Sequence, residues 1–128
     1  AACMNADWEY LKQLALTEVE ATGHALPAPL RERIGKIPVT FERVPHPDFV
    51  ADGIEPDSLG LFTGPAFGEE EFAASPVPPQ IILYLENLWD FAGGDPAIYG
   101  EEVRTTYLHE LGHYLGLDED DLTERGLD

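Results

Sequence analysis

The apolar residues near both ends of the chain recur with the period of an α-helix. In the N-terminal part they fall at three- and four-residue steps, which predicts a helix from an N-cap at Asn5 to about Gly23. Its apolar face consists of Trp8, Leu11, Ala15 and Val19. A second long helix is predicted to start at Asp95-Pro96, where an acidic N-cap precedes a proline in the first turn, and to run toward Gly116.

Shorter apolar runs between these helices predict strands. A short helix is expected at residues 29–34, and the strands are expected at residues 37–44, 59–63 and 80–85. Residues 45–58 contain three prolines, a glycine and four acids, which is typical of a loop. We therefore expect an α+β fold in one domain, residues 1–128. In it a small sheet of about three strands packs with an N-terminal and a C-terminal helix that cover its faces.

The charge of the chain narrows the choice of partners. There are 7 Lys and Arg against 25 Asp and Glu, a net charge of −18, whereas small domains usually carry a net charge of about 2–8 in magnitude. Nucleic acids and anionic membranes require a basic patch, so neither is expected as a partner. Cations are favoured, above all by residues 65–128, which hold 15 of the acids and two bases.

The cysteine content bears on the compartment. Cys3 is the only cysteine, so the chain cannot form an intramolecular disulfide. It does not depend on an oxidising compartment, and a cytoplasmic location is expected. The oligomeric state is not predicted by the sequence.

The C-terminal helix contains the motif His109-Glu110-Leu111-Gly112-His113. Residues four apart on a helix project about 40° apart, so both imidazoles face one way and can hold one metal ion. Glu110 lies about 100° round from His109, too far for a third ligand but near enough to reach a water molecule beside the metal. The motif therefore predicts two metal ligands and a general base.

The remaining residues of this helix agree with that orientation. The apolar positions fall on one arc of about 140°, roughly opposite the two histidines. Glu102 and Thr106 share the histidine face and are candidates to orient the imidazoles. The apolar arc, which is expected to face the core, consists of Val103, Tyr107, Leu108, Leu111, Tyr114 and Leu115.

A catalytic zinc site needs a third protein ligand and an open position. Gly116 can adopt the left-handed conformation that ends a helix, and this would turn the following residues back toward the histidines. The acids in that segment are Asp118, Glu119, Asp120 and Asp121.

The pattern HExxHxxGxxE at residues 109–119 resembles the extended zincin motif, whose last position supplies the third metal ligand. From about residue 5 to its end, the chain is similar to the small bacterial minimal zincins, a family of zincin-like metallopeptidases with a compact α/β core. The resemblance implies Glu119 as the third ligand. Asp118 is the main rival, although its position suits the N-cap of a final short helix. No methionine follows the motif and only nine residues follow Glu119, so the third ligand must be local.

The resemblance implies a zinc-dependent hydrolase, and more narrowly a metallopeptidase that acts on peptide or protein substrates. His109 and His113 would bind Zn²⁺ as neutral imidazoles, and Glu110 would take a proton from the attacking water and pass it to the leaving amine. Manganese, iron or cobalt also suit two histidines and a carboxylate. In zincins an edge strand beside the active-site helix pairs with extended substrate, and residues 80–85 or 59–63 are the candidates here.

Two alternatives to a peptidase remain at this point. One is a metal-binding or interaction module that has kept the zincin site without turnover. The other is a metal amidase that acts on a small substrate. Identification of cleavage products separates the amidase from a peptidase.

Other residues with chemical potential are expected to be structural. His24 and His46 are expected to lie in loops flanked by Gly or Pro, and to be exposed rather than to bind metal. Trp8, Trp89 and Phe91 are expected in the core. The acidic run at residues 118–121 does not resemble a calcium loop, because alternating oxygen ligands and a central glycine are absent.

Overall fold

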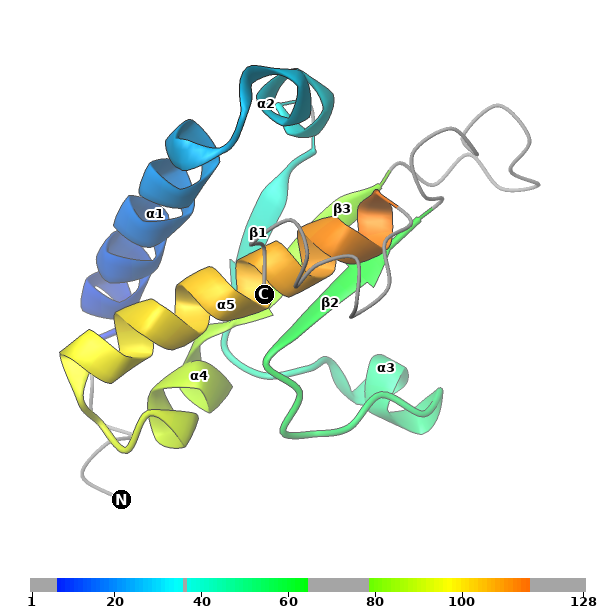
Figure 1. The fold of residues 1–128 in the computed structure, drawn as a ribbon. Coiled ribbons are helices and arrows are strands. Elements are labelled where there is room, and N and C mark those ends of the chain that lie inside the picture. Colours follow the sequence, from blue (N-terminus) through cyan, green and yellow to red (C-terminus); the bar gives the residue numbers. More distant parts are fainter. Residues whose placement is uncertain (1–6, 36, 65–78, 116–128) are drawn as a thin grey trace.

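Five helices and three strands make up the part of the chain that this computed structural model describes, residues 7–35, 37–64 and 79–115 (Figure 1). The helices are α1 (Trp8–Ala25), α2 (Ala28–Ile34), α3 (Pro47–Ala51), α4 (Leu85–Phe91) and α5 (Pro96–Tyr114). The strands are β1 (Val39–Glu42), β2 (Gly60–Thr63) and β3 (Gln80–Tyr84). The prediction of an α+β fold with a small three-stranded sheet is confirmed.

The central strand of the sheet is β3. It pairs in parallel with β1, where Val39 lies opposite Ile81. It pairs antiparallel with β2, where Phe62 lies opposite Ile81. Since both edges of β3 are occupied, the prediction that residues 80–85 offer an edge to substrate is wrong. Among the described strands β2 is an edge strand, and it remains the candidate.

Both long helices lie over the same face of the sheet. α5 packs on β2 and β3, and α1 packs on α5 (Figure 1). One core cluster joins Leu11 and Ala15 of α1 with Ile81 and Leu83 of β3. The expectation that the two helices cover both faces is therefore wrong. The reason is that the apolar face of α1 finds its partner in α5, so that the two helices bury one face of the sheet together.

A strong N-cap starts α5, as the sequence predicts. The Asp95 carboxylate accepts hydrogen bonds from the backbone N–H groups of Ala97 at 2.9 Å and Ile98 at 3.3 Å. The Tyr99 hydroxyl donates to the Leu11 carbonyl oxygen at 2.9 Å and thereby ties α5 to α1. The predicted apolar arc is buried except for its last member, which is half-buried: Val103, Tyr107, Leu108, Leu111, Tyr114 and Leu115.

The short helix α3 lies within residues 45–58, whose composition predicts a loop. The His46 side chain caps it by accepting a hydrogen bond from the Asp48 N–H at 3.0 Å, and Pro47 occupies its first turn. Pro47, one of the three prolines that favour a loop in this segment, is the first residue of the helix. The expectation of an entirely irregular segment is therefore wrong.

The helix α4, which the sequence pattern does not predict, follows β3 directly. Its buried residues Leu85, Leu88 and Trp89 recur at helical spacing, and Leu85 belongs to the helix rather than to the strand. Phe91 falls outside this face and is 64% exposed, so the expectation that it lies in the core is wrong. Trp89 is buried as predicted, and Trp8 is half-buried.

The N-terminal helix α1 begins at Trp8 and ends at Ala25, two residues beyond the predicted Gly23. Asn5, the predicted N-cap, lies outside the described residues. Asp7 precedes the helix, and its side chain makes no capping hydrogen bond. None of the helices in the described part of the chain has the length and apolar character needed to cross a bilayer.

The close approach of β2 to α5 depends on the absence of a side chain at Gly60. A Cβ atom at this position would lie 2.6 Å from Thr106 Cγ2 and 3.3 Å from the carbonyl oxygen of Ile82. Thr106 is buried, and its branched side chain has few alternative rotamers in a helix. The glycine therefore sets the distance between the edge strand and the helix that carries the candidate site.

We expect Gly60→Ala to lower the free energy of unfolding by about 1–3 kcal/mol, the usual cost of overpacking a core. Urea unfolding measures the change. The variant Thr106→Ser removes the Cγ2 atom and keeps the hydroxyl, so the double variant should recover much of the loss. Additive effects of the two substitutions would show that this contact is not the cause.

Candidate metal centre

The last turns of α5 bring together His109, Glu110 and His113. Each can offer one ligand atom such that all of these atoms lie within 4.8 Å of one another. The two imidazole rings have their centroids 4.7 Å apart and are inclined at 66°. The arrangement follows from helix geometry, since residues four apart lie one above the other on the same face. In the described part of the chain this is the single group of three or more such side chains.

The three side chains differ in exposure. The His113 side chain is 50% exposed and that of Glu110 only 10%, while His109 is half-buried. The histidines therefore reach the surface from the side of the helix opposite its apolar arc, and the carboxylate lies deeper. A metal ion held by the imidazoles would be open to solvent on one side and bordered by the carboxylate on the other.

Glu110 is held by two hydrogen-bond donors. Its Oε1 lies 3.3 Å from Nδ1 of His113, and its carboxylate also accepts a hydrogen bond from the backbone N–H of Phe62 in β2. Burial raises the pKa of Glu110 above its ordinary value of 4.5. The charges of His113 and His109 and the two hydrogen bonds oppose this effect in part. A raised pKa brings the carboxyl closer to the range in which it can both accept and release a proton near neutral pH.

The donor from Phe62 follows from the geometry of the β2 edge. The Tyr84 N–H donates to the Leu59 carbonyl at 3.0 Å, which makes Gly60 and Phe62 members of non-hydrogen-bonded pairs with β3. Their backbone groups therefore point away from β3, toward the edge of β2 that pairs with no other described strand. The sequence predicts a strand at residues 59–63 but not this contact. A backbone N–H is present in every residue except proline, so no residue type marks it as a donor to Glu110.

The donor set suits zinc. Two imidazole nitrogens are typical zinc ligands, and the nearby carboxylate supplies negative charge to a site that would gain a cation. A hydrogen bond from Nδ1 of His113 to Glu110 leaves Nε2 of the same ring available for a metal. The buried Glu110 carboxylate, which desolvation destabilises, would be stabilised by a nearby positive charge.

The structure does not test the third ligand. Glu119, its rival Asp118 and the turning residue Gly116 all lie outside the described residues. The assignment of Glu119 therefore remains a prediction. Of the two residues proposed to orient the imidazoles, Thr106 is buried beside Gly60 of β2 and Glu102 is half-buried on α5.

The other two histidines lie apart from this group. His24 is exposed in the last turn of α1, rather than in a loop. His46 is exposed and caps α3, where its Nδ1 lies 3.6 Å from the Asp48 carboxylate. Their predicted exposure is confirmed. Neither belongs to the cluster on α5.

Comparison with known proteins agrees with the site. Residues 34–127 match the model of the family described as zincin-like metallopeptidase, a span that includes the sheet, α5 and the motif. A search of curated proteins finds no match to the sequence. The match covers most of the chain, and with it the resemblance to zincins is confirmed. The chain belongs to the family of zincin-like metallopeptidases.

Proposed function

We propose that this protein is a zinc-dependent metallopeptidase that cleaves peptide or protein substrates along the open edge of β2. The observation that carries the proposal is the position of Glu110. Its carboxylate lies between His113 of α5 and the backbone N–H of Phe62, at the junction of the histidine pair and the edge strand. A substrate bond placed there would meet both the metal ligands and a base.

Each residue of the cluster has a distinct part in this proposal. His109 and His113 hold the zinc ion, with Glu119 as the third ligand. When bound, zinc polarises the scissile carbonyl and lowers the pKa of water toward about 7. Glu110 accepts the proton of the attacking water on its carboxylate and delivers it to the leaving amine. The Phe62 N–H orients this carboxylate, and burial keeps it from bulk water.

The edge of β2 is suited to pairing with an extended peptide substrate. The backbone groups of Gly60 and Phe62 point away from β3, and a peptide could add to this edge as a further strand. The Gly60 carbonyl already accepts a hydrogen bond from Ser58 Oγ at 2.9 Å, so fewer backbone acceptors remain at that end. The net charge of −18 favours neutral or basic peptides over acidic ones, most strongly at low salt.

The proposal is tested with zinc-reconstituted protein and a library of unmodified peptides. Metal analysis should give stoichiometric zinc, and mass spectrometry should identify products cut at internal peptide bonds. Loss of products on chelation, and their return on zinc addition, ties cleavage to the metal. Stoichiometric zinc without cleavage of any library member would favour the non-catalytic module. Cleavage restricted to small amides would favour an amidase, and failure to retain zinc would refute both the site and the function.

A further inference from the structure

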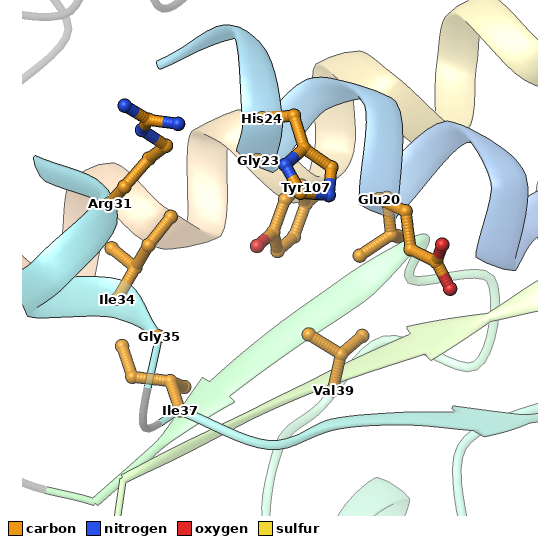
Figure 2. A pocket seen from close by; sticks show the side chains of 10 residues that line it. Glu20, Gly23, His24, Arg31, Ile34, Gly35, Ile37, Val39 and Tyr107 are labelled. Atoms are coloured by element: carbon orange, nitrogen blue, oxygen red, sulfur yellow. The ribbon is translucent and has the colours of Figure 1, made fainter. Parts of the chain in front are cut away.

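A cavity lies on the side of α5 away from the histidines. It has a volume of about 400 Å³ and opens between the C-terminal part of α1, α2, the start of β1 and the middle of α5 (Figure 2). This volume falls within the range of about 300–1,000 Å³ typical of small-molecule sites. Residues of the proposed metal centre do not line it.

The floor of the cavity is apolar. Val19, Ile34 and Ile37 are each 6–9% exposed, and Val39 of β1 is half-buried. Tyr107 contributes its ring to the floor, and Figure 2 shows its hydroxyl directed toward the side of the cavity where Ile34 and Arg31 lie. A ligand that fits this floor must have an aliphatic or aromatic body.

The charged residues on the rim differ between the two ends of the cavity. Arg31 of α2 stands at one end and Glu20 of α1 at the other, where its carboxylate points away from Arg31 (Figure 2). Both are exposed. Among the described residues, no carboxylate forms an ion pair with Arg31. Arg31 and the Tyr107 hydroxyl are thus hydrogen-bond donors on the α2 side of an apolar floor, and the Arg31 guanidinium stands above that floor rather than against the hydroxyl (Figure 2).

We propose that this cavity binds a small monocarboxylate with an apolar body. The carboxylate would lie at the end formed by Arg31, whose guanidinium can donate two parallel hydrogen bonds to it. The apolar body would lie on Ile34, Ile37 and the Tyr107 ring. A second carboxylate at the far end would meet Glu20 and the negative field of the protein, so dicarboxylates with an acid at each end should bind more weakly.

This site is separate from the proposed active site. Tyr107 precedes His109 by two residues on α5, which places the two side chains about 200° apart around the helix. Tyr107 faces the core and is 6% exposed, whereas the histidines face the opposite surface. The proposal therefore does not depend on zinc or on peptidase activity, and it is tested without either.

The test uses the full chain, labelled with ¹⁵N, and three probes. 3-Phenylpropanoate should bind with saturable shifts of the amide signals of Gly23, Gly35 and Tyr107. Its neutral analogue 3-phenylpropanamide should bind at least fivefold more weakly, and the dicarboxylate 3-(4-carboxyphenyl)propanoate, which carries one acid at each end, more weakly still. Equal affinity for the acid and the amide, or shifts confined to residues elsewhere, would overturn the proposal.

Three variants locate the binding groups. Arg31→Gln should weaken binding of the acid about five- to tenfold and leave the amide unaffected, whereas the matched control Arg104→Gln, which removes an exposed charge on α5, should leave both unchanged. Gly23→Leu should abolish binding of both probes, because a Cβ atom at Gly23 lies 4.0 Å from the Tyr107 hydroxyl and a larger side chain would extend into the cavity. Unchanged binding of the acid by Arg31→Gln would refute the assignment even if Gly23→Leu fails to fold.

Discussion

Replacement of Glu110 by Gln is expected to reduce peptide hydrolysis by at least about 10²–10⁴-fold, the usual contribution of a general base. The amide keeps the shape of the side chain and can still accept the hydrogen bond from the Phe62 N–H. It cannot take up a proton from water. Because Glu110 is not a predicted ligand, the variant should bind zinc with the stoichiometry of the parent. Steady-state cleavage of a peptide from the library and metal analysis of the same sample measure the two properties.

The stability of the metal-free variant provides an internal control. Burial raises the pKa of Glu110 in the folded state above 4.5, so the folded protein binds this proton more tightly than the unfolded chain. The resulting stabilisation is complete below about pH 4.5 and is lost as the pH rises through the raised pKa. Gln carries no such proton. Metal-free Glu110→Gln should therefore match the parent in acid and be more stable at neutral pH, as measured by urea unfolding at several pH values.

These two results distinguish a base from a metal ligand. If Glu110 binds the metal, the Gln variant should lose zinc as well as activity. If the chain is a non-catalytic module, the variant should differ from the parent in stability alone. Loss of activity together with retained zinc and a gain in neutral-pH stability is expected only for a buried general base.

The parts of the fold and site that the sequence predicts are those that depend on local geometry. The side chains at 109, 110 and 113 meet because all three lie on one helix, and helix periodicity fixes their relative directions. The start of α5 is equally local, because the capping residue, the proline and the capped N–H groups lie within four residues. Such features need no knowledge of how distant segments pack.

The features that the sequence does not predict arise from contacts between distant segments. The position of β2 at an edge of the described sheet depends on which strand occupies its centre, and both candidate strands have similar apolar patterns. The hydrogen bond from Phe62 to Glu110 joins β2 to α5 through a backbone group. The cavity beside Tyr107 requires α1, α2, β1 and α5 to be placed together. Tertiary packing, rather than the local pattern, determines each of these.

Loss of either histidine is expected to abolish the metal site. His109→Ala and His113→Ala should each lower zinc affinity by more than about 100-fold, because even loss of a partner that only orients a ligand costs about 10–100-fold. His24→Ala is the matched control, since His24 is a helical histidine, exposed like His113, and lies outside the cluster. Competition with a chromophoric chelator measures the affinities, and circular dichroism confirms that each variant is folded. Zinc affinity in both variants equal to that of His24→Ala would remove the basis for a metal centre on α5.

The same assay decides between the two acids proposed for the third ligand. Glu119→Ala should weaken zinc binding by a factor comparable with the histidine variants, whereas Asp118→Ala should leave it nearly unchanged and alter stability alone, as a helix N-cap would. The reverse result would assign Asp118 to the metal. A carboxylate at either position gives a site of two imidazoles and one carboxylate, with the open coordination position that hydrolysis requires. If neither variant affects affinity, neither of these two acids is the third ligand, and the motif-based assignment of Glu119 is wrong.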